Sequence, residues 1–110
     1  MMVKRTDLPR KIDSLVEDLK ASYGAERIIL YGSHSSGNTA NHGDVDLVVI
    51  KRTSRPFFDR LRDVARACHW HDAVDVLVYT PEEYENLRNT NWFVREEIEK
   101  KGQLIYESGS

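Results

Sequence analysis

The sequence predicts an α/β (α+β) fold in which a small mixed β-sheet is covered by helices. Three short runs of aliphatic and β-branched residues along the chain are typical of buried strands. Segments with apolar residues at three- and four-residue spacing, typical of amphipathic helices, precede, separate and follow these runs. The predicted order is helix, strand, turn, strand, helix, strand, helix and helix, followed by an edge strand.

The first predicted helix ends at Gly24, a residue suited to the left-handed position after a helix. Thr6 or Asp7 is expected to cap its start, with Pro9 in its first turn. Its apolar stripe consists of Ile12, Leu15, Val16, Leu19 and Tyr23. This spacing buries one face of the helix and leaves the other to solvent.

The later helices have equally clear signals. One begins after Pro56, and its predicted apolar face consists of Phe57, Leu61, Val64, Ala65 and Cys68. Residues 80–83 (TPEE) match a capping box with proline at the first helical position, and they begin a helix that continues through Leu87. The sequence Asn89-Thr90-Asn91 is predicted to end it, and a last short helix is predicted at 92–101.

The strands are predicted at 27–31, 45–50 and 74–79, with an edge strand at 104–106. Residues 32–43 are rich in glycine, serine, asparagine and histidine, so a loop is expected between the first two strands.

Length and composition indicate one globular domain over residues 1–110. The net charge of −2 argues against a protein that binds nucleic acid through overall basicity. Cys68 is the single cysteine, so neither an internal disulfide nor a cysteine-based zinc site is expected. The N-terminus lacks the apolar segment of a secretory signal, and no apolar run is long enough to cross a membrane. A soluble, cytoplasmic domain is expected.

Aspartates lie in two of the aliphatic strands, where this residue is depleted. Asp44 and Asp46 are two residues apart and therefore point to the same face of the sheet. Asp75 lies at the start of the next strand. Converging carboxylates repel one another unless cations lie between them, and their hard oxygen ligands suit Mg²⁺. The alternative is that all three lie at solvent-facing strand ends and are hydrated.

Gly32-Ser33 directly follows the first strand and suggests a phosphate site. Glycine lets backbone approach a phosphate closely, the amides of the following turn can bind an anion, and the serine hydroxyl adds a donor. Alone, this pair is a common turn. Its significance comes from its position, with ten residues between Ser33 and Asp44.

The combination of Gly32-Ser33, Asp44-x-Asp46 and Asp75 resembles the motif of the DNA polymerase β-like nucleotidyltransferase superfamily. Residues 86–107 (NLRNTNWFVREEIEKKGQLIYE) are similar to its minimal, MNT-type proteins. The resemblance implies the polymerase β-like fold, with the triphosphate of ATP held by the Gly-Ser pair. It further implies two Mg²⁺ ions bound by the first two aspartates, with the third completing one site and activating the attacking hydroxyl.

Two positions depart from the family pattern. Ser36 precedes Gly37 where many members have arginine, and Gly43 precedes the first aspartate where serine is common. Neither change removes a metal ligand, so the expected reaction type is unaffected.

Minimal members resemble antitoxins that silence a HEPN-type ribonuclease toxin by transferring AMP to one of its tyrosines. The resemblance therefore implies a toxin partner. For so small a domain, a homodimer or a hetero-oligomer with the toxin is expected, and the charge and hydropathy predict no direct contact with nucleic acid or membrane. Two alternatives are a non-catalytic antitoxin that acts by binding and a small-molecule transferase of the aminoglycoside-modifying kind.

Several other residues have competing interpretations. His69-Trp70-His71-Asp72 has the spacing of a transition-metal site, although a solvent-exposed helix end is favoured. His34 and His42 lie in the loop beside the predicted phosphate site, where a solvated role is favoured over contact with a nucleotide. Trp92 and Phe93 are adjacent and cannot share one helix face. One is expected to pack inward, while the other is a candidate contact for a partner.

Overall fold

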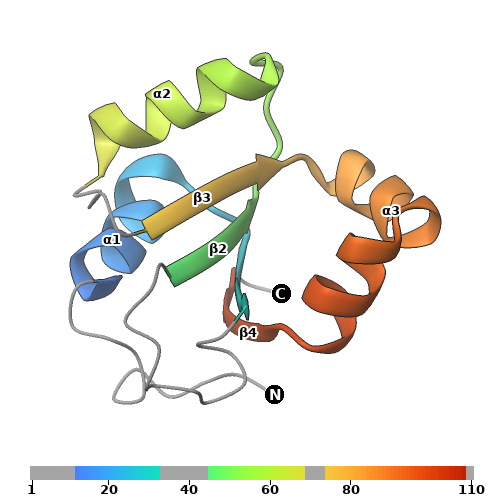
Figure 1. Cartoon of the computed structure of the whole chain (residues 1–110). Helices are drawn as coiled ribbons and strands as arrows, with labels where there is room; N and C mark the ends of the chain where they lie inside the picture. The colour runs from blue at the N-terminus through green and yellow to red at the C-terminus, as the bar shows by residue number, and fades with distance from the viewer. Residues whose placement is uncertain (1–11, 33–44, 69–73, 109–110) are drawn as a thin grey trace.

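The computed structural model describes residues 12–32, 45–68 and 74–108. Its elements in chain order are α1 (Asp13–Asp18), the π-helical segment η3 (Leu19–Tyr23), β1 (Arg27–Tyr31), β2 (Val45–Ile50), α2 (Phe57–Ala67), β3 (Val74–Tyr79), α3 (Pro81–Thr90), the π-helical segment η5 (Val94–Lys100) and β4 (Gln103–Glu107). The predicted α/β (α+β) class is confirmed, and Figure 1 shows the sheet between two groups of helices. No helix in these ranges is both long and apolar enough to cross a membrane.

The four strands form one mixed sheet in the order β3-β2-β1-β4. β1 pairs antiparallel with both β2 and β4, whereas β2 and β3 run parallel. The parallel pair requires a crossover, and α2 supplies it. Consequently β3 and β4 are the edge strands, and β1 and β2 lie in the centre of the sheet.

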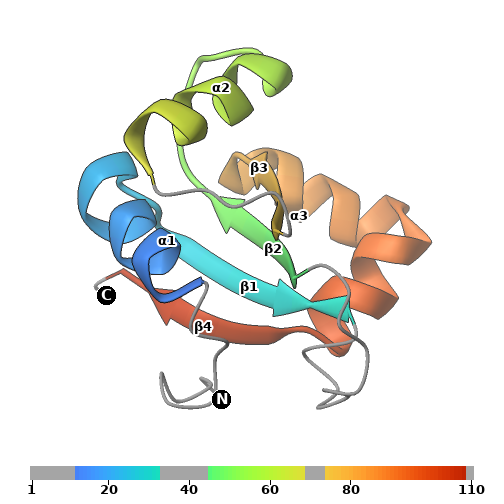
Figure 2. The same cartoon turned by 60° about the vertical axis from the view of Figure 1, so that its left-hand side comes forward.

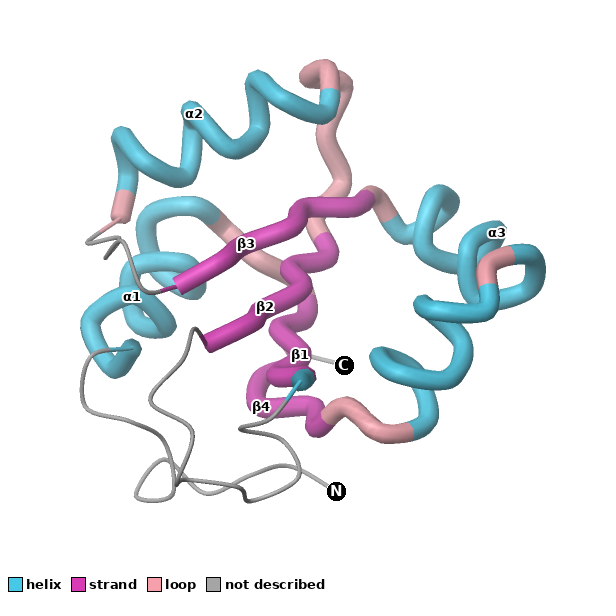
Figure 3. The backbone as a smooth tube through the Cα atoms, in the orientation of Figure 1, coloured by secondary structure: helices cyan, strands magenta, loops and turns pink. Residues whose placement is uncertain are grey.

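Each face of the sheet is covered by its own helices, as Figures 2 and 3 show. On one face, α1, η3 and α2 pack against alternate strand residues that include Ile28, Leu47 and Val76. On the other face, α3 and η5 pack against the intervening residues, which include Ile29 and Val48. This alternation explains why the two central strands are aliphatic along almost their whole length.

The structure confirms several of the predicted helix ends and strands. Gly24 ends the first helix with a φ of 80°, and the three predicted strands match β1, β2 and β3. The capping box is present at the start of α3, where the side chain of Thr80 accepts a hydrogen bond from the backbone of Glu83 and the Glu83 side chain accepts one from Thr80. The predicted cap residues before position 12 lie outside the described residues.

Other boundaries and faces differ from the predictions. α3 continues to Thr90, and the side chains of Asn89 and Thr90 donate hydrogen bonds to carbonyl groups of the preceding helical turn. On α2, Ala65 is exposed, and Arg60 is buried at 5% exposure. Trp92 and Phe93 are both exposed, so neither is packed fully inward.

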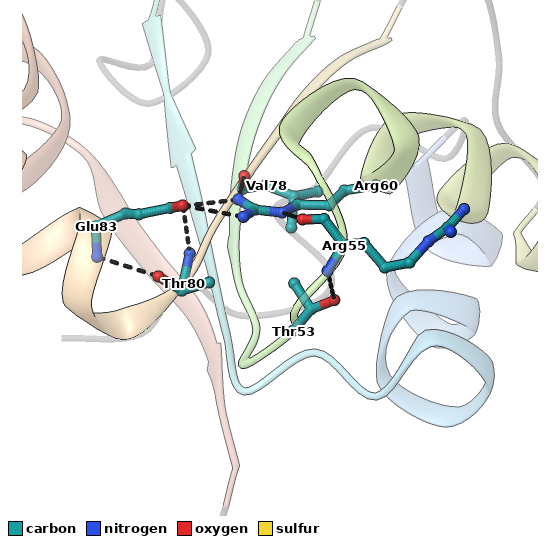
Figure 4. Close-up of polar contacts among 6 residues, drawn as sticks. All are labelled: Thr53, Arg55, Arg60, Val78, Thr80 and Glu83. Carbon is teal, nitrogen blue, oxygen red and sulfur yellow. Dashed lines mark hydrogen bonds and ion pairs between the residues drawn. The ribbon is translucent and has the colours of Figure 1, made fainter.

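Arg60 is buried, and each of its three guanidinium nitrogens donates at least one hydrogen bond within the protein (Figure 4). Its Nη1 donates to the carbonyl oxygen of Val78 at 3.1 Å, and its Nε donates to that of Arg55 at 2.8 Å. The Glu83 carboxylate receives two further bonds, from Nη1 at 2.6 Å and from Nη2 at 2.9 Å. This network joins α2 to the end of β3 and the start of α3.

Candidate active site

The structure brings Asp46 and Asp75 together on adjacent strands. They are direct partners in the parallel pair of β2 and β3, near the N-terminal ends of both strands. Because side chains alternate along a strand, both lie on the face that carries α3 and η5. Two carboxylates that are far apart in the sequence therefore share one end of the sheet.

Gly32 lies directly against Asp46. Its φ of +83° is in the left-handed region, which favours glycine. A Cβ atom at this position would be 2.6 Å from Oδ2 of Asp46, closer than real Cβ contacts. Glycine is therefore required both by the backbone turn after β1 and by the closeness of the carboxylate.

Tyr31, the last residue of β1, completes this end of the sheet. It is the cross-strand partner of Asp46 and is buried. Burial raises the pKa of its hydroxyl well above the ordinary value of 10.0, and the negative charges of Asp46 and Asp75 raise it further. Tyr31 thus remains neutral beside the two carboxylates.

The ring of Phe93 stands against Tyr31. The two ring centroids are 6.0 Å apart and the planes meet at 83°, an edge-to-face contact. Phe93 directly precedes η5, whose Val94 and Ile98 pack on the sheet. The start of η5 is thereby fixed next to the carboxylate end of the sheet.

The comparison with known families agrees with this geometry. A family model described as a nucleotidyltransferase domain matches residues 12–105. The chain belongs to this nucleotidyltransferase family. The matched range includes every residue proposed for the site.

A solved structure supports the fold of this nucleotidyltransferase. A protein from Sulfolobus solfataricus, provisionally assigned as a nucleotidyltransferase, has a TM-score of 0.59 and 18% sequence identity. The match covers 98% of this chain and 93% of the other. At that identity the likeness establishes the shared fold. No protein with curated function matches the nucleotidyltransferase.

Three predicted features lie outside the described residues. These are Ser33 and Asp44 of the predicted motif, together with the loop histidines and the sequence 69–72. Their assignments in the nucleotidyltransferase remain predictions from the sequence. Within the described ranges there is no group of three or more His, Cys, Asp or Glu residues that could hold a metal ion.

The exposure of Asp75 differs from the prediction. Asp75 was expected to be an unfavourable residue inside an aliphatic strand, yet it is exposed, because β3 is an edge strand. Water can hydrate its carboxylate without a cation. Asp46, on a central strand, is half-buried. The case for a cation site therefore rests on the pairing of the two aspartates rather than on the burial of Asp75.

Sequence reasoning missed the aromatic part of the site. The sequence pattern predicts Tyr31 only as a strand residue, although its position immediately before Gly32 also places it beside the predicted phosphate site. The sequence singles out Phe93 only as a candidate partner contact, because its contact with β1 joins segments far apart in the chain.

A pocket of about 440 Å³ lies at the other end of β1 and β2. Arg27, Ile50, Tyr84 and Arg88 are among its lining residues. On β2, Ile50 is at the opposite end from Asp46. This pocket of the nucleotidyltransferase is therefore separate from the carboxylates.

Proposed function

We propose that this domain is a magnesium-dependent nucleotidyltransferase that moves AMP from ATP to a hydroxyl group of a partner protein. The observation that carries the proposal is the direct pairing of Asp46 with Asp75 beside the turn at Gly32. Two oxygen donors thereby adjoin a backbone that a phosphate can approach closely. The family match supports nucleotidyl transfer as the class of reaction.

Magnesium fits the chemistry of these donors, because it prefers carboxylate oxygens and retains positions for phosphate oxygens. Asp46 and Asp75 would hold it, with Asp44 as a further ligand from its place two residues before Asp46. We propose two ions, in keeping with the three predicted carboxylates. When bound, the metal neutralises charge on the triphosphate and orients it for displacement.

The transfer forms one bond and breaks one. The acceptor oxygen bonds to the α-phosphorus, and the bond from that phosphorus to the bridging oxygen breaks, so pyrophosphate leaves with the electron pair. We assign Asp75 the role of accepting the proton of the acceptor hydroxyl, because its carboxylate is exposed to an incoming group. Neutral Tyr31 adds no negative charge that would repel the phosphates.

Gly32 and Ser33 bind the triphosphate in this proposal. Gly32 has no side chain between the backbone and an incoming phosphate. Ser33 contributes its hydroxyl as a hydrogen-bond donor, as the family resemblance implies. The chain's contribution is mainly to position the reactants and balance their charge.

For the acceptor, we propose a tyrosine of a HEPN-type ribonuclease toxin, so that the chain acts as an antitoxin. The support is the similarity of residues 86–107, and of the Gly-Ser and Asp-x-Asp spacing, to minimal MNT-type proteins. A complex with the toxin, or a homodimer, is the proposed assembly.

The test is co-incubation of the chain, Mg²⁺ and ATP labelled at the α-phosphate with the product of the neighbouring gene. Label should be transferred to that protein, and this transfer should be lost when Asp44→Asn and Asp46→Asn are combined. Asp59→Asn is the matched control, because Asp59 pairs with Arg62 on α2, across the sheet from the site. Neutralisation of the partner that survives the double substitution unchanged would show that binding alone is sufficient.

A further inference from the structure

Phe93 is a large apolar side chain that remains 46% exposed. Single exposed aromatic residues are common on protein surfaces, so this exposure means little alone. Its position is more informative. The ring contacts Tyr31, and Tyr31 is the direct cross-strand partner of Asp46.

The neighbouring side chains at this end of the sheet form a short series. Asp75 pairs with Asp46, Asp46 pairs with Tyr31, and Tyr31 contacts Phe93. The series passes from the two carboxylates, through the buried ring of Tyr31, to the exposed ring of Phe93. It therefore changes from a polar region suited to metal and phosphates to an apolar region suited to a flat, uncharged group.

Phe93 is also held in place rather than free to move aside. Val94 and Ile98 of η5 are buried against the sheet, and the Tyr31 contact fixes the ring itself. The start of η5 is tied further by Asn91, whose side-chain oxygen accepts a hydrogen bond from the backbone N–H of Val94 at 3.1 Å. A pre-positioned ring binds a flat partner with little loss of conformational entropy.

We propose that the exposed ring of Phe93 is the surface on which the nucleobase of the bound nucleoside triphosphate stacks. This inference rests on the proposed function, in which Gly32, Asp46 and Asp75 hold the metal-bound triphosphate. A nucleotide extends from charged phosphates to an apolar base, as the series of side chains extends from carboxylates to an aromatic ring. Phe93 is accordingly a specificity residue, remote from the reacting atoms.

The chemistry of a phenylalanine ring also defines the selectivity. It offers no hydrogen-bond donor or acceptor, so it cannot distinguish adenine from guanine by their edges. Any base can stack on the ring because every base has an aromatic face, and a larger base shares more contact area with it. Phe93 should therefore favour purine over pyrimidine nucleotides and discriminate poorly between the two purines.

The test compares two ligands of the full chain by calorimetry in Mg²⁺. One is ATP with a methylene group between the α- and β-phosphorus atoms, which prevents transfer, and the other is inorganic tripolyphosphate, which has no base. Phe93→Ala should weaken binding of the nucleotide by roughly 5- to 100-fold. Binding of tripolyphosphate should change by less than about 2-fold, because its contacts lie elsewhere.

Three further variants separate stacking from a general disturbance. Phe93→Tyr keeps the aromatic face and should bind the nucleotide like the natural chain, whereas Phe93→Leu fills space against Tyr31 without such a face and should resemble Phe93→Ala. Phe58→Ala removes an equally apolar ring that is 76% exposed. Phe58 contacts Phe57, which lies against Tyr79 at the far end of β3 from Asp75, so binding should not change.

The outcomes are distinguishable. The role of Phe93 would be overturned if Phe93→Ala lost affinity equally for both ligands, or lost none for the nucleotide. It would also be overturned if Phe93→Ala bound the nucleotide normally but transferred less of it to the partner protein. If the natural chain bound tripolyphosphate and the nucleotide equally, the phosphate site would stand and the base site would not. If it bound neither in Mg²⁺, the proposed function would fail together with this inference.

Discussion

Gly32 and Asp46 lie so close that a methyl group on Gly32 would be 2.6 Å from the Asp46 carboxylate. The contact joins the turn after β1 to the second strand, and it places a carboxylate next to the proposed phosphate site. Any side chain at position 32 must displace Asp46 or distort the turn.

Gly32→Ala should lower nucleotidyl transfer by at least about 10-fold, since small displacements of catalytic groups have large effects on rate. It should also destabilise the fold by roughly 1–3 kcal/mol, because alanine resists a φ of +83°. Initial transfer rates and urea denaturation measure the two effects.

Gly24→Ala is the matched control for this prediction. Gly24 has a similar φ of +80°, but its added Cβ would approach only the end of the flexible Lys51 side chain, at 3.2 Å. The control should show a comparable loss of stability with nearly natural activity. A similar loss of transfer in both variants would mean that strain, and not displacement of Asp46, causes the effect.

Asp46→Asn should separate function from stability. It removes one of two paired negative charges, so we expect the unfolding temperature without Mg²⁺ to stay constant or rise. Mg²⁺ with ATP should raise the unfolding temperature of the natural chain through linkage, but should have little effect on the variant. Thermal scans with and without Mg²⁺ and ATP would show this, and an undiminished ligand shift in Asp46→Asn would contradict the proposed metal site.

Arg60→Ala should destabilise the fold by roughly 2–4 kcal/mol, because it leaves carbonyl oxygens and a carboxylate without their donors. Arg62→Ala on the same helix is the control. Its side chain is exposed and its ion pair with Asp59 is long, at 3.8 Å, so the change should stay below about 0.5 kcal/mol. Chemical denaturation of both variants measures the difference, and equal losses would show that Arg60 has no special role.

Glu83 should make stability depend on pH in the acidic range. The hydrogen bonds from Arg60, aided by the backbone N–H of Thr80, hold the pKa of Glu83 below its ordinary value of 4.5. A group with a lowered folded-state pKa stabilises the fold above its unfolded value, and this contribution is lost as pH falls through the folded value. The natural chain should therefore lose stability as pH drops below about 4.5.

Glu83→Gln tests this dependence. The variant should be less stable than the natural chain at pH 7. The difference in the free energy of unfolding should narrow as the pH falls below 4.5, the ordinary pKa of a glutamate. Urea denaturation at pH 7 and at several acidic values measures the trend. Glu82→Gln, which removes an exposed carboxylate beside it, should change stability at pH 7 by less than about 0.5 kcal/mol. A constant difference between natural chain and Glu83→Gln at all pH values would contradict the assignment.

Local patterns in the sequence were enough to predict the strands, the helices and the kinds of side chain that they carry. Strands at 27–31, 45–50 and 74–79 were predictable because aliphatic runs bounded by glycine and polar residues have few alternatives. The capping box at Thr80 and the helix end at Gly24 were predictable because they depend on neighbouring residues alone. The aspartates in two strands predict a site at one end of the sheet.

Which of these residues come into contact depends on the tertiary structure. The register that pairs Asp46 with Asp75, the edge position of β3 that exposes Asp75, and the contact of Phe93 with Tyr31 all join distant segments. Such contacts depend on how the faces of the sheet are shared between helices, which periodicity within one segment does not encode. For the same reason the helical spacing after Pro56 does not predict the burial of Arg60, which depends on Glu83, 23 residues later in the chain.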